Sequence, residues 1–179
     1  LTPGDAEAAE KVASVAIMDP DFRYIRLDRQ GLEPIYHGGF DELYERGFGH
    51  IAEGQSVVII ACGILVQKAL LAQKILDEQG VSAGVIDLFR IKPINGKALA
   101  SILSGYNATV TVDEQSLEGG MGAAVLEAMA DYSVLKPIKR LGMQDGYVVI
   151  NGDRDSLHEL YEIDTPHIVN AVLELAERF

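Results

Sequence analysis

Three arginines stand within seven residues near the start of the chain, in the segment RYIRLDR. A guanidinium such as that of Arg23, Arg26 or Arg29 suits phosphate because its planar fork donates two hydrogen bonds at once. On an extended strand, Arg23 and Arg29 would share one face, and Arg26 would point the other way with Tyr24 and Asp28. The pattern alone fits either an anion-binding site or a scaffold of salt bridges.

A second stretch that could do chemistry is TVTVDEQSLEGGMG, residues 109–122, where a strand pattern runs into glycines and a helix begins. Its glycines, at 119, 120 and 122, lack the G-x-G-x-x-G spacing, and no Lys-Ser or Lys-Thr pair follows as in a P-loop. Although a helix N-terminus favours anions, Glu114 and Glu118 would repel a phosphate placed there. The loop is therefore predicted to be a tight strand-to-helix turn that faces a domain or subunit interface.

The remaining residues of reactive type predict no catalytic set and no metal site. The four histidines lack metal-ligand spacing, and two of them, His158 and His167, are expected on helix surfaces. The single cysteine, Cys62, lies in VVIIACG and is interpreted as a small buried apolar residue. The segment INGDRD resembles a Gly-Asp-Gly diphosphate motif only in part, and we interpret it as a capped turn before a helix near Ser156.

Residues 54–179 alternate strand and helix patterns, which predicts a domain that could position such residues. Strands are expected at short β-branched runs, and helices where apolar residues recur every three or four positions. The predicted strands are 56–61, 81–89, 108–113 and 137–143, the last at an edge because Pro137 opens it. The predicted helices are 64–80, 95–105, 122–132 and two near the C-terminus, with Ser156 and Thr165 as N-caps.

This order of elements predicts an α/β fold, a doubly wound, mostly parallel sheet of about five strands with helices on both faces.

The first 53 residues do not show this alternation of strand and helix patterns. A helix over 5–18 and a strand over 22–28 cannot close a core, so residues 1–29 must pack on another domain or chain. Residues 30–53, rich in Gly and aromatics without a clean period, are predicted to be an extended linker between this remnant and the domain at 54–179.

Composition argues against some classes of partner. The formal net charge of −12 opposes binding to nucleic acid and to anionic lipid. Hydrophobic residues make up 48% of the chain, which is ordinary for a globular protein. No apolar run approaches the roughly 20 residues of a membrane helix, and a lone cysteine fits a reducing compartment. We therefore expect a cytoplasmic protein with no nucleic-acid and no membrane partner.

Longer stretches of the sequence resemble one family, the transketolases. The chain is similar to the C-terminal domain of these thiamine-diphosphate-dependent enzymes in VVIIACGILVQKALLAQKILDEQGVSAGVIDLFRIKPIN, in VTVDEQSLEGGMGAAVLEAMAD and in KRLGMQDGY. The likeness lies in a strand that ends in a small residue and Gly, a KPI turn, a DE…GG.G loop and an LG..D strand end. The last helix and strand of the family's pyrimidine-binding domain resemble the upstream segment PGDAEAAEKVASVAIMDPDFRYIRLDRQ.

The resemblance implies a chain that is not catalytic alone. Thiamine diphosphate and Mg²⁺ (or Ca²⁺) would be bound outside it, by a cofactor-binding N-terminal domain or subunit, and a homodimer is expected. The implied reaction transfers two-carbon ketol units between sugar phosphates. In RLDRQ, Arg29 matches the family arginine that holds the substrate phosphate. Arg26 is a second candidate, although the strand alternation places it on the other face.

Three alternatives stay open. One is deoxyxylulose-phosphate synthase, where a Pro-Arg-Gly type of ending is expected in place of RLDRQ. Another is the β subunit of 2-oxo-acid dehydrogenases, whose substrates lack phosphate and would not need Arg29. The third belongs to a different class, a non-catalytic binding or assembly module that binds a partner or small regulator at the switch point of its sheet.

Overall fold

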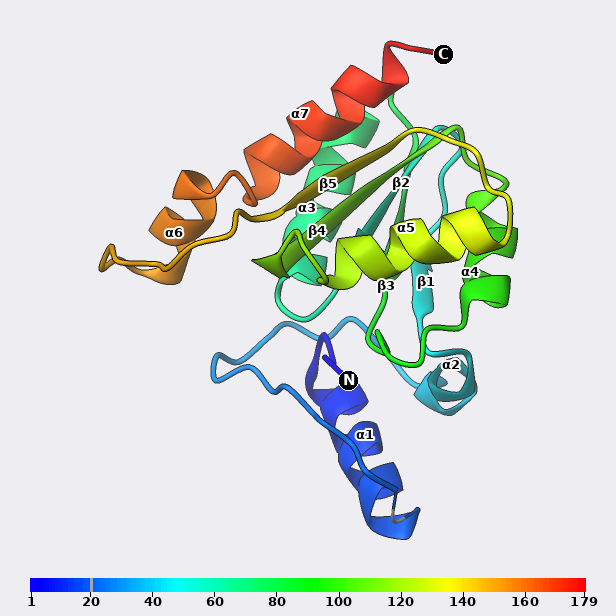
Figure 1. The fold of residues 1–179 in the computed structure, drawn as a ribbon, viewed down its shortest axis with the longest axis vertical. Coiled ribbons are helices and arrows are strands. Elements are labelled where there is room, and N and C mark those ends of the chain that lie inside the picture. The colour runs from blue at the N-terminus through cyan, green and yellow to red at the C-terminus, as the bar shows by residue number, and fades with distance from the viewer. Residues whose placement is uncertain (20) are drawn as a thin grey trace.

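The computed structural model describes residues 1–19 and 21–179, and it is built around one five-stranded sheet (Figure 1). The order of strands across the sheet is β1-β3-β2-β4-β5. Strands β2 to β5 run parallel, and β1 pairs antiparallel with β3 at one edge. The strands are β1 Gly49–Ala52, β2 Val57–Ala61, β3 Ala83–Asp87, β4 Ala108–Ser116 and β5 Ile138–Met143. The predicted mostly parallel sheet of about five strands is therefore confirmed.

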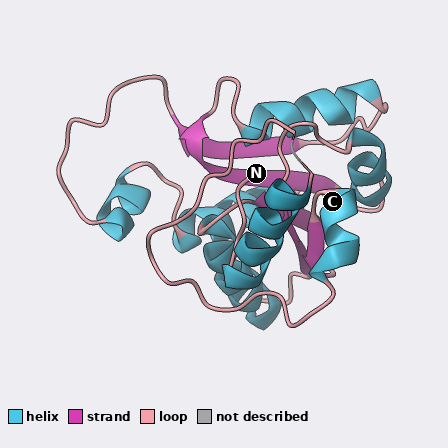
Figure 2. Cartoon of the chain, turned by 90° about the horizontal axis from the view of Figure 1, so that it is seen from below, coloured by secondary structure: helices cyan, strands magenta, loops and turns pink. Residues whose placement is uncertain are grey.

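Helices cover both faces of this sheet, as Figure 2 shows around the magenta strands. One face packs against α3 and α7, and the other packs against α4 and α5. Among the described residues, no helix is both long and apolar enough to cross a membrane. The helices are α1 Ala6–Met18, α2 Phe40–Arg46, α3 Leu65–Glu78, α4 Gly96–Leu103, α5 Met121–Asp131, α6 Arg154–Leu160 and α7 Thr165–Ala176.

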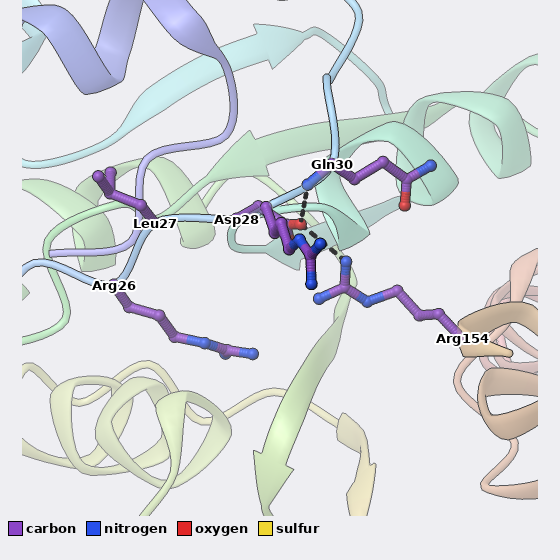
Figure 3. A pocket seen from close by; sticks show the side chains of 6 residues that line it. Arg26, Leu27, Asp28, Gln30 and Arg154 are labelled. Carbon is purple, nitrogen blue, oxygen red and sulfur yellow. Dashed lines mark hydrogen bonds and ion pairs between the residues drawn. The ribbon is translucent and has the colours of Figure 1, made fainter. Parts of the chain in front are cut away.

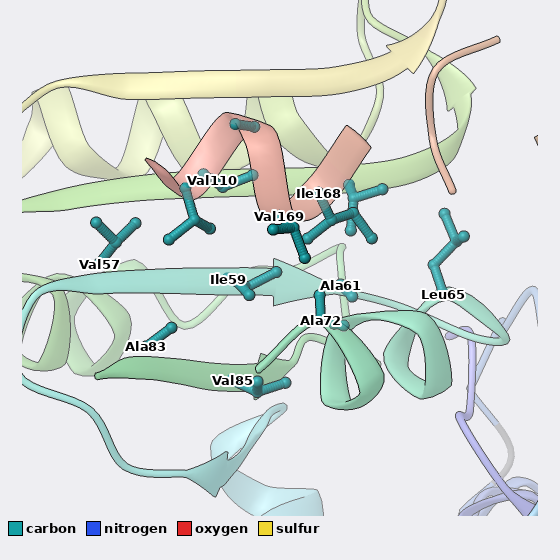
Figure 4. Packing of buried hydrophobic residues seen from close by; sticks show 14 of the residues in the cluster. Val57, Ile59, Ala61, Leu65, Ala72, Ala83, Val85, Val110, Ile168 and Val169 are labelled. Atoms are coloured by element: carbon teal, nitrogen blue, oxygen red, sulfur yellow. The ribbon is translucent and has the colours of Figure 1, made fainter. Parts of the chain in front are cut away.

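Strand β2 lies at the centre of the core, and all five of its residues are buried. Its side chains alternate between the faces, so Ile59 and Ala61 lie with the α3 and α7 side chains in Figure 4. Val58 and Ile60 belong to the second cluster, on the side of α4 and α5. Coverage of both faces is the reason that this strand reads as an unbroken apolar run.

Residues 22–28 form no strand, and this prediction was wrong. The alternating sequence has no neighbouring strand to pair with among the described residues. The segment forms backbone hydrogen bonds with the chain terminus instead: Arg26 N donates to Leu1 O at 2.9 Å, and the Leu1 amino group donates to Tyr24 O at 2.8 Å. Because alternation holds only for a regular strand, it does not decide where the arginine side chains of this segment point.

The segment 30–53 is more ordered than the predicted extended linker. It contains helix α2, bracketed by Gly39 and Gly47 with left-handed φ values of 81° and 88°, and edge strand β1. The aromatic side chains of this segment, Tyr36, Phe40, Tyr44 and Phe48, are buried, and Phe40 packs with Phe89 of the sheet domain. The glycines therefore mark helix boundaries, not only a loop. The domain boundary at 53/54 stays a prediction.

The N-caps of the last two helices lie before the predicted residues, by three positions in α6 and by one in α7. Asp153 caps α6 by accepting from Ser156 N, and Asp164 caps α7 by accepting from His167 N. Asp, Ser and Thr are all common N-cap residues, and each segment contains an Asp as well as a Ser or Thr. Residue preference alone therefore does not decide which of them caps the helix. The boundary error matters for α6, because it makes Arg154 the first helical residue and not part of a loop.

Two buried carboxylates attach the first fifty residues to the sheet. Asp5 accepts from the backbone N–H groups of Ala8, Ile35 and Tyr36 at 2.8–2.9 Å. The Tyr36 hydroxyl in turn donates to Asp87, at the end of β3, at 2.8 Å. Burial raises the pKa of Asp87 to about 7, with the Asp5 charge adding to this effect and the Tyr36 hydrogen bond opposing it.

We predict that the contribution of Asp87 to the free energy of unfolding falls as pH rises from about 4 to 7, and that Asp87→Asn removes this contribution. The folded pKa of about 7 lies above the ordinary value of 3.8, so the folded state keeps a proton that the unfolded state has released. The slope from one such group is at most about 1.4 kcal/mol per pH unit. Urea unfolding between pH 5 and 8 measures it, with exposed Asp131→Asn as the matched control. Equal slopes in Asp87→Asn and wild type would contradict the assignment.

Candidate functional site

The candidate site is a cavity of about 600 Å³ where the start of the chain meets the first turn of α6. Its lining contains both arginines that the sequence proposed for phosphate, Arg26 and Arg29, and a third that it missed, Arg154. In Figure 3, Arg26 and Arg154 extend toward the region of Asp28 from opposite sides. The predicted separation of Arg26 from Arg29 onto opposite faces was wrong, because residues 22–28 are not a strand.

The side chains beside this cavity are organised by one carboxylate, Glu114, near the end of β4. Arg26 Nη2 donates to Glu114 Oε2 at 2.8 Å. Arg154 donates twice, from Nε to Oε1 at 2.8 Å and from Nη2 to Oε2 at 3.3 Å. His158 Nε2 lies 2.7 Å from Oε1. Three separate parts of the chain, residues 22–30, β4 and α6, therefore meet at a single acidic side chain.

Glu114 is ionised throughout the neutral range. Burial by itself would raise its pKa, but the hydrogen bond from His158 and the charge and hydrogen bonds of Arg154 outweigh burial and lower the pKa to about 2. The sequence argument counted Glu114 as an acid that repels phosphate. In the structure its charge is offset by two guanidinium groups. An anion in the cavity beside it therefore meets less electrostatic repulsion than the sequence suggested.

Arg154 also binds a second carboxylate, Asp28, so it bridges two acids. Its Nη1 donates to Asp28 Oδ1 at 2.8 Å, and the same oxygen accepts from the backbone N–H of Gln30 at 3.0 Å. Burial tends to raise the pKa of Asp28, but the Arg154 hydrogen bond leads the effects that leave it lowered. No local pattern in INGDRD pointed to this role, since the partners lie 40 and 126 residues away in sequence.

The three arginines of RYIRLDR therefore have different surroundings. Arg23 pairs with Asp19 and lines a different cleft, and Arg26 pairs with Glu114, so the salt-bridge interpretation is correct for both. Arg29 is exposed and forms no ion pair with any of the described residues. Of the three guanidinium groups that line the cavity, that of Arg29 is the one without a carboxylate partner among the described residues.

His158 is buried, which contradicts its expected place on a helix surface. Its ring faces inward from α6 to Glu114, and its Nδ1 has no hydrogen-bond partner within the described part of the chain. The prediction treated the histidine as one of many polar residues on a terminal helix. The helix in fact turns this residue toward the end of β4, where it supports the same carboxylate as Arg26 and Arg154.

The glycine loop after β4 is a tight turn, as predicted. The N-terminus of α5, where an anion would be expected, is already filled by the buried Asp113 carboxylate, whose Oδ2 accepts from Met121 N at 3.0 Å. A Cβ on Gly120 would lie 2.2 Å from Ser116 O, so the turn has no room for a side chain there. The loop is therefore not a phosphate cradle. Its expected place at a domain or subunit interface stays a prediction.

Cys62 is buried, as the sequence predicted for a small apolar residue. Its Sγ lies 3.7 Å from Asp113 Oδ1. Burial first, and then the Asp113 charge, raise the pKa of this thiol well above its ordinary value. The thiolate is the nucleophilic form of cysteine, so this environment does not suit a reactive residue.

A larger cleft of about 1080 Å³ lies between the start of the chain and the sheet domain. Phe22 and Tyr24 line it from one side, and Arg90 and Pro93 line it from the other. The residues around this cleft include part of a group of exposed apolar side chains, of which Phe22 and Tyr24 line the cleft and Leu27 lines the arginine-lined cavity. The group consists of Ile17, Met18, Phe22, Tyr24 and Leu27, which we call the N-terminal apolar patch.

Comparison with known proteins identifies similar chains. A protein described as a transketolase C-terminal section, from Methanocaldococcus jannaschii, is 34% identical over 84% of this chain and 47% of its own length. The 1-deoxy-D-xylulose-5-phosphate synthase of Caldanaerobacter subterraneus subsp. tengcongensis is 32% identical over 69% of this chain and 20% of its own. The chain therefore spans about half the length of the first of these relatives and a fifth of the second.

A solved structure matches nearly the whole chain. It is described as a split gene transketolase in the form of an inactive beta4 tetramer, and it superposes with a TM-score of 0.87 at 31% identity. The match covers 98% of this chain and 56% of the other. Finally, the family model of the transketolase C-terminal domain matches residues 49–168, well over half of the chain. The chain belongs to the transketolase C-terminal domain family.

Proposed function

We propose that the chain is the C-terminal part of a thiamine-diphosphate-dependent transketolase, as a segment or a separate subunit, and that Arg29 binds the substrate phosphate. The observation that carries this proposal is the exposed Arg29 beside two charge-satisfied arginines, in a cavity on a chain of net charge −12. An exposed guanidinium with no ion pair there suits the phosphate of a sugar.

The cofactor site is proposed to lie on another domain or subunit. A diphosphate commonly sits at a helix N-terminus beside a glycine loop, but here Asp113 already occupies that position on α5. Among the described residues, no group of three His, Cys, Asp or Glu side chains could hold a metal ion. These residues do not fit thiamine diphosphate with its metal. The contribution of this chain is to bind and orient the phosphorylated end of the substrate.

The N-terminal apolar patch supports a partner that carries the cofactor. Its five side chains are each more than 60% exposed, and two of them, Phe22 and Tyr24, line the larger cleft. Several large apolar side chains exposed within one short stretch of a charged chain are typical of a contact with another protein or domain. We propose that the cofactor-binding half of the enzyme covers it, and that two such complexes form a homodimer in the cytoplasm.

Deoxyxylulose-phosphate synthase is the second candidate function, favoured by the 32% identical relative with that name. Both functions use phosphorylated sugars, so both would use Arg29. They differ in the donor and in the product. An assay of the reconstituted enzyme with a ketose phosphate donor, and separately with a 2-oxo-acid donor, distinguishes the two functions.

We predict that Arg29→Ala raises KM for phosphorylated acceptors about tenfold or more and leaves KM for the free sugars nearly unchanged. A charge-assisted hydrogen bond is worth about 1.5–3 kcal/mol, which corresponds to this change. The chain is mixed with its cofactor-binding half, and ketol transfer is measured for both kinds of acceptor. Arg178→Ala, an exposed arginine at the far end of the chain, is the control for loss of one positive charge. Equal effects on both kinds of acceptor would remove the phosphate role of Arg29.

We predict that Phe22→Asp weakens association with the cofactor-binding half by about tenfold or more, because burying a Phe side chain is worth about 1.5–3 kcal/mol. The Phe22 side chain is 94% exposed in this chain, so the substitution leaves the fold intact. Leu135→Asp is the matched control, since Leu135 is 90% exposed but lies outside the N-terminal apolar patch. Titration calorimetry measures both variants. Unchanged affinity in Phe22→Asp would show that the patch is not the contact surface.

A further inference from the structure

The turn that carries Arg29 has few attachments to the rest of the protein. It belongs to no helix or strand, and Leu27, Arg29 and Gln30 are exposed. The bond from Gln30 N to Asp28 is local to the turn. Between the Arg26 anchor and Leu32, which packs on the core, Arg154–Asp28 is the one side-chain hydrogen bond from the described residues that ties the turn to another element. The position of Arg29 therefore depends on this contact.

Arg154 is itself held firmly at the other end of the contact. Two of its nitrogens bind Glu114, and the third binds Asp28, so all three guanidinium nitrogens are used. Its backbone is fixed because it is the first residue of α6, directly after the Asp153 cap. A lysine has a single ammonium group on a flexible stem and cannot make this three-point bridge.

The same contact changes the electrostatics of the cavity. Asp28 lines the cavity together with Arg29, and a bare carboxylate there would repel a phosphate. Arg154 places a positive charge 2.8 Å from that carboxylate. At this distance in a partly buried setting, the attraction offsets much of the repulsion that the phosphate would otherwise meet. Arg154 thus acts on both the order and the charge of the Arg29 turn.

We propose that Arg154 is a positioning residue for phosphate recognition: by bridging Glu114 and Asp28 it holds the Arg29 turn ready for the phosphate and neutralises the acid beside it. The inference rests on the proposed phosphate role of Arg29. It assigns to the C-terminal domain, through α6, an indirect part in substrate affinity. A preordered turn binds more tightly because less conformational entropy is lost when the ligand arrives.

The test uses the whole chain and inorganic phosphate as the probe. Backbone amide NMR at low ionic strength gives order parameters for residues 28–30, and a phosphate titration gives Kd from their chemical shifts. Arg154→Met is expected to lower the order parameters of these residues and to weaken phosphate binding about three- to tenfold. Arg178→Met is the control for charge, and unchanged amide shifts in β2 and β3, which do not contact Arg154, show that the core is intact.

A second variant breaks the same contact from its other end. Asp28→Asn leaves Arg154 on Glu114 but weakens the bridge to the turn, and it is expected to lower the order parameters of residues 29–30 as well. If residues 28–30 keep their order in both variants, or if Arg154→Met binds phosphate as tightly as wild type, the positioning role is overturned.

The Arg29→Ala variant separates this inference from the proposed function. Loss of the phosphate-dependent shifts in Arg29→Ala supports the phosphate role, and the Arg154 variants then decide the positioning role alone. If wild type shows no such shifts at residues 28–30, or if Arg29→Ala binds phosphate as wild type does, the phosphate role fails and the inference fails with it.

Discussion

The ionised carboxylate of Glu114 is the interaction on which the candidate site depends. It receives hydrogen bonds from Arg26 and Arg154 and contacts His158, so it joins the start of the chain, the sheet and α6 at one point. Charged hydrogen bonds of this kind are strong when the partners are shielded from water. Because these residues come from distant parts of the sequence, the fold of the sheet domain determines where the cavity forms.

The sheet explains why that point is fixed in space. Parallel strands end at a common edge, and Glu114, Asp113 and Asp87 all lie near the ends of β4 and β3. Asp113 holds the start of α5, and Asp87 holds Tyr36 of the preceding segment. These two acids therefore act as structural anchors at this edge of the sheet.

Most of the fold could be predicted from the sequence, whereas the candidate site could be predicted only in part. Apolar periodicity marked β2 and α3 because local burial patterns determine them. Residues 22–28 also alternate, but alternation cannot tell whether a partner strand exists. The family resemblance indicated Arg29. The roles of Arg154 and His158 could not be predicted, because they depend on contacts with Glu114 that form only in the tertiary structure.

Edge strand β1 has a practical consequence for any attempt to isolate the sheet domain. It lies before residue 54, yet it pairs antiparallel with β3 and covers that edge of the sheet. A protein trimmed at residue 54 would present the bare backbone of β3, and unpaired strand edges promote aggregation. Expression of the domain by itself should therefore begin upstream of Gly49, with α2 retained.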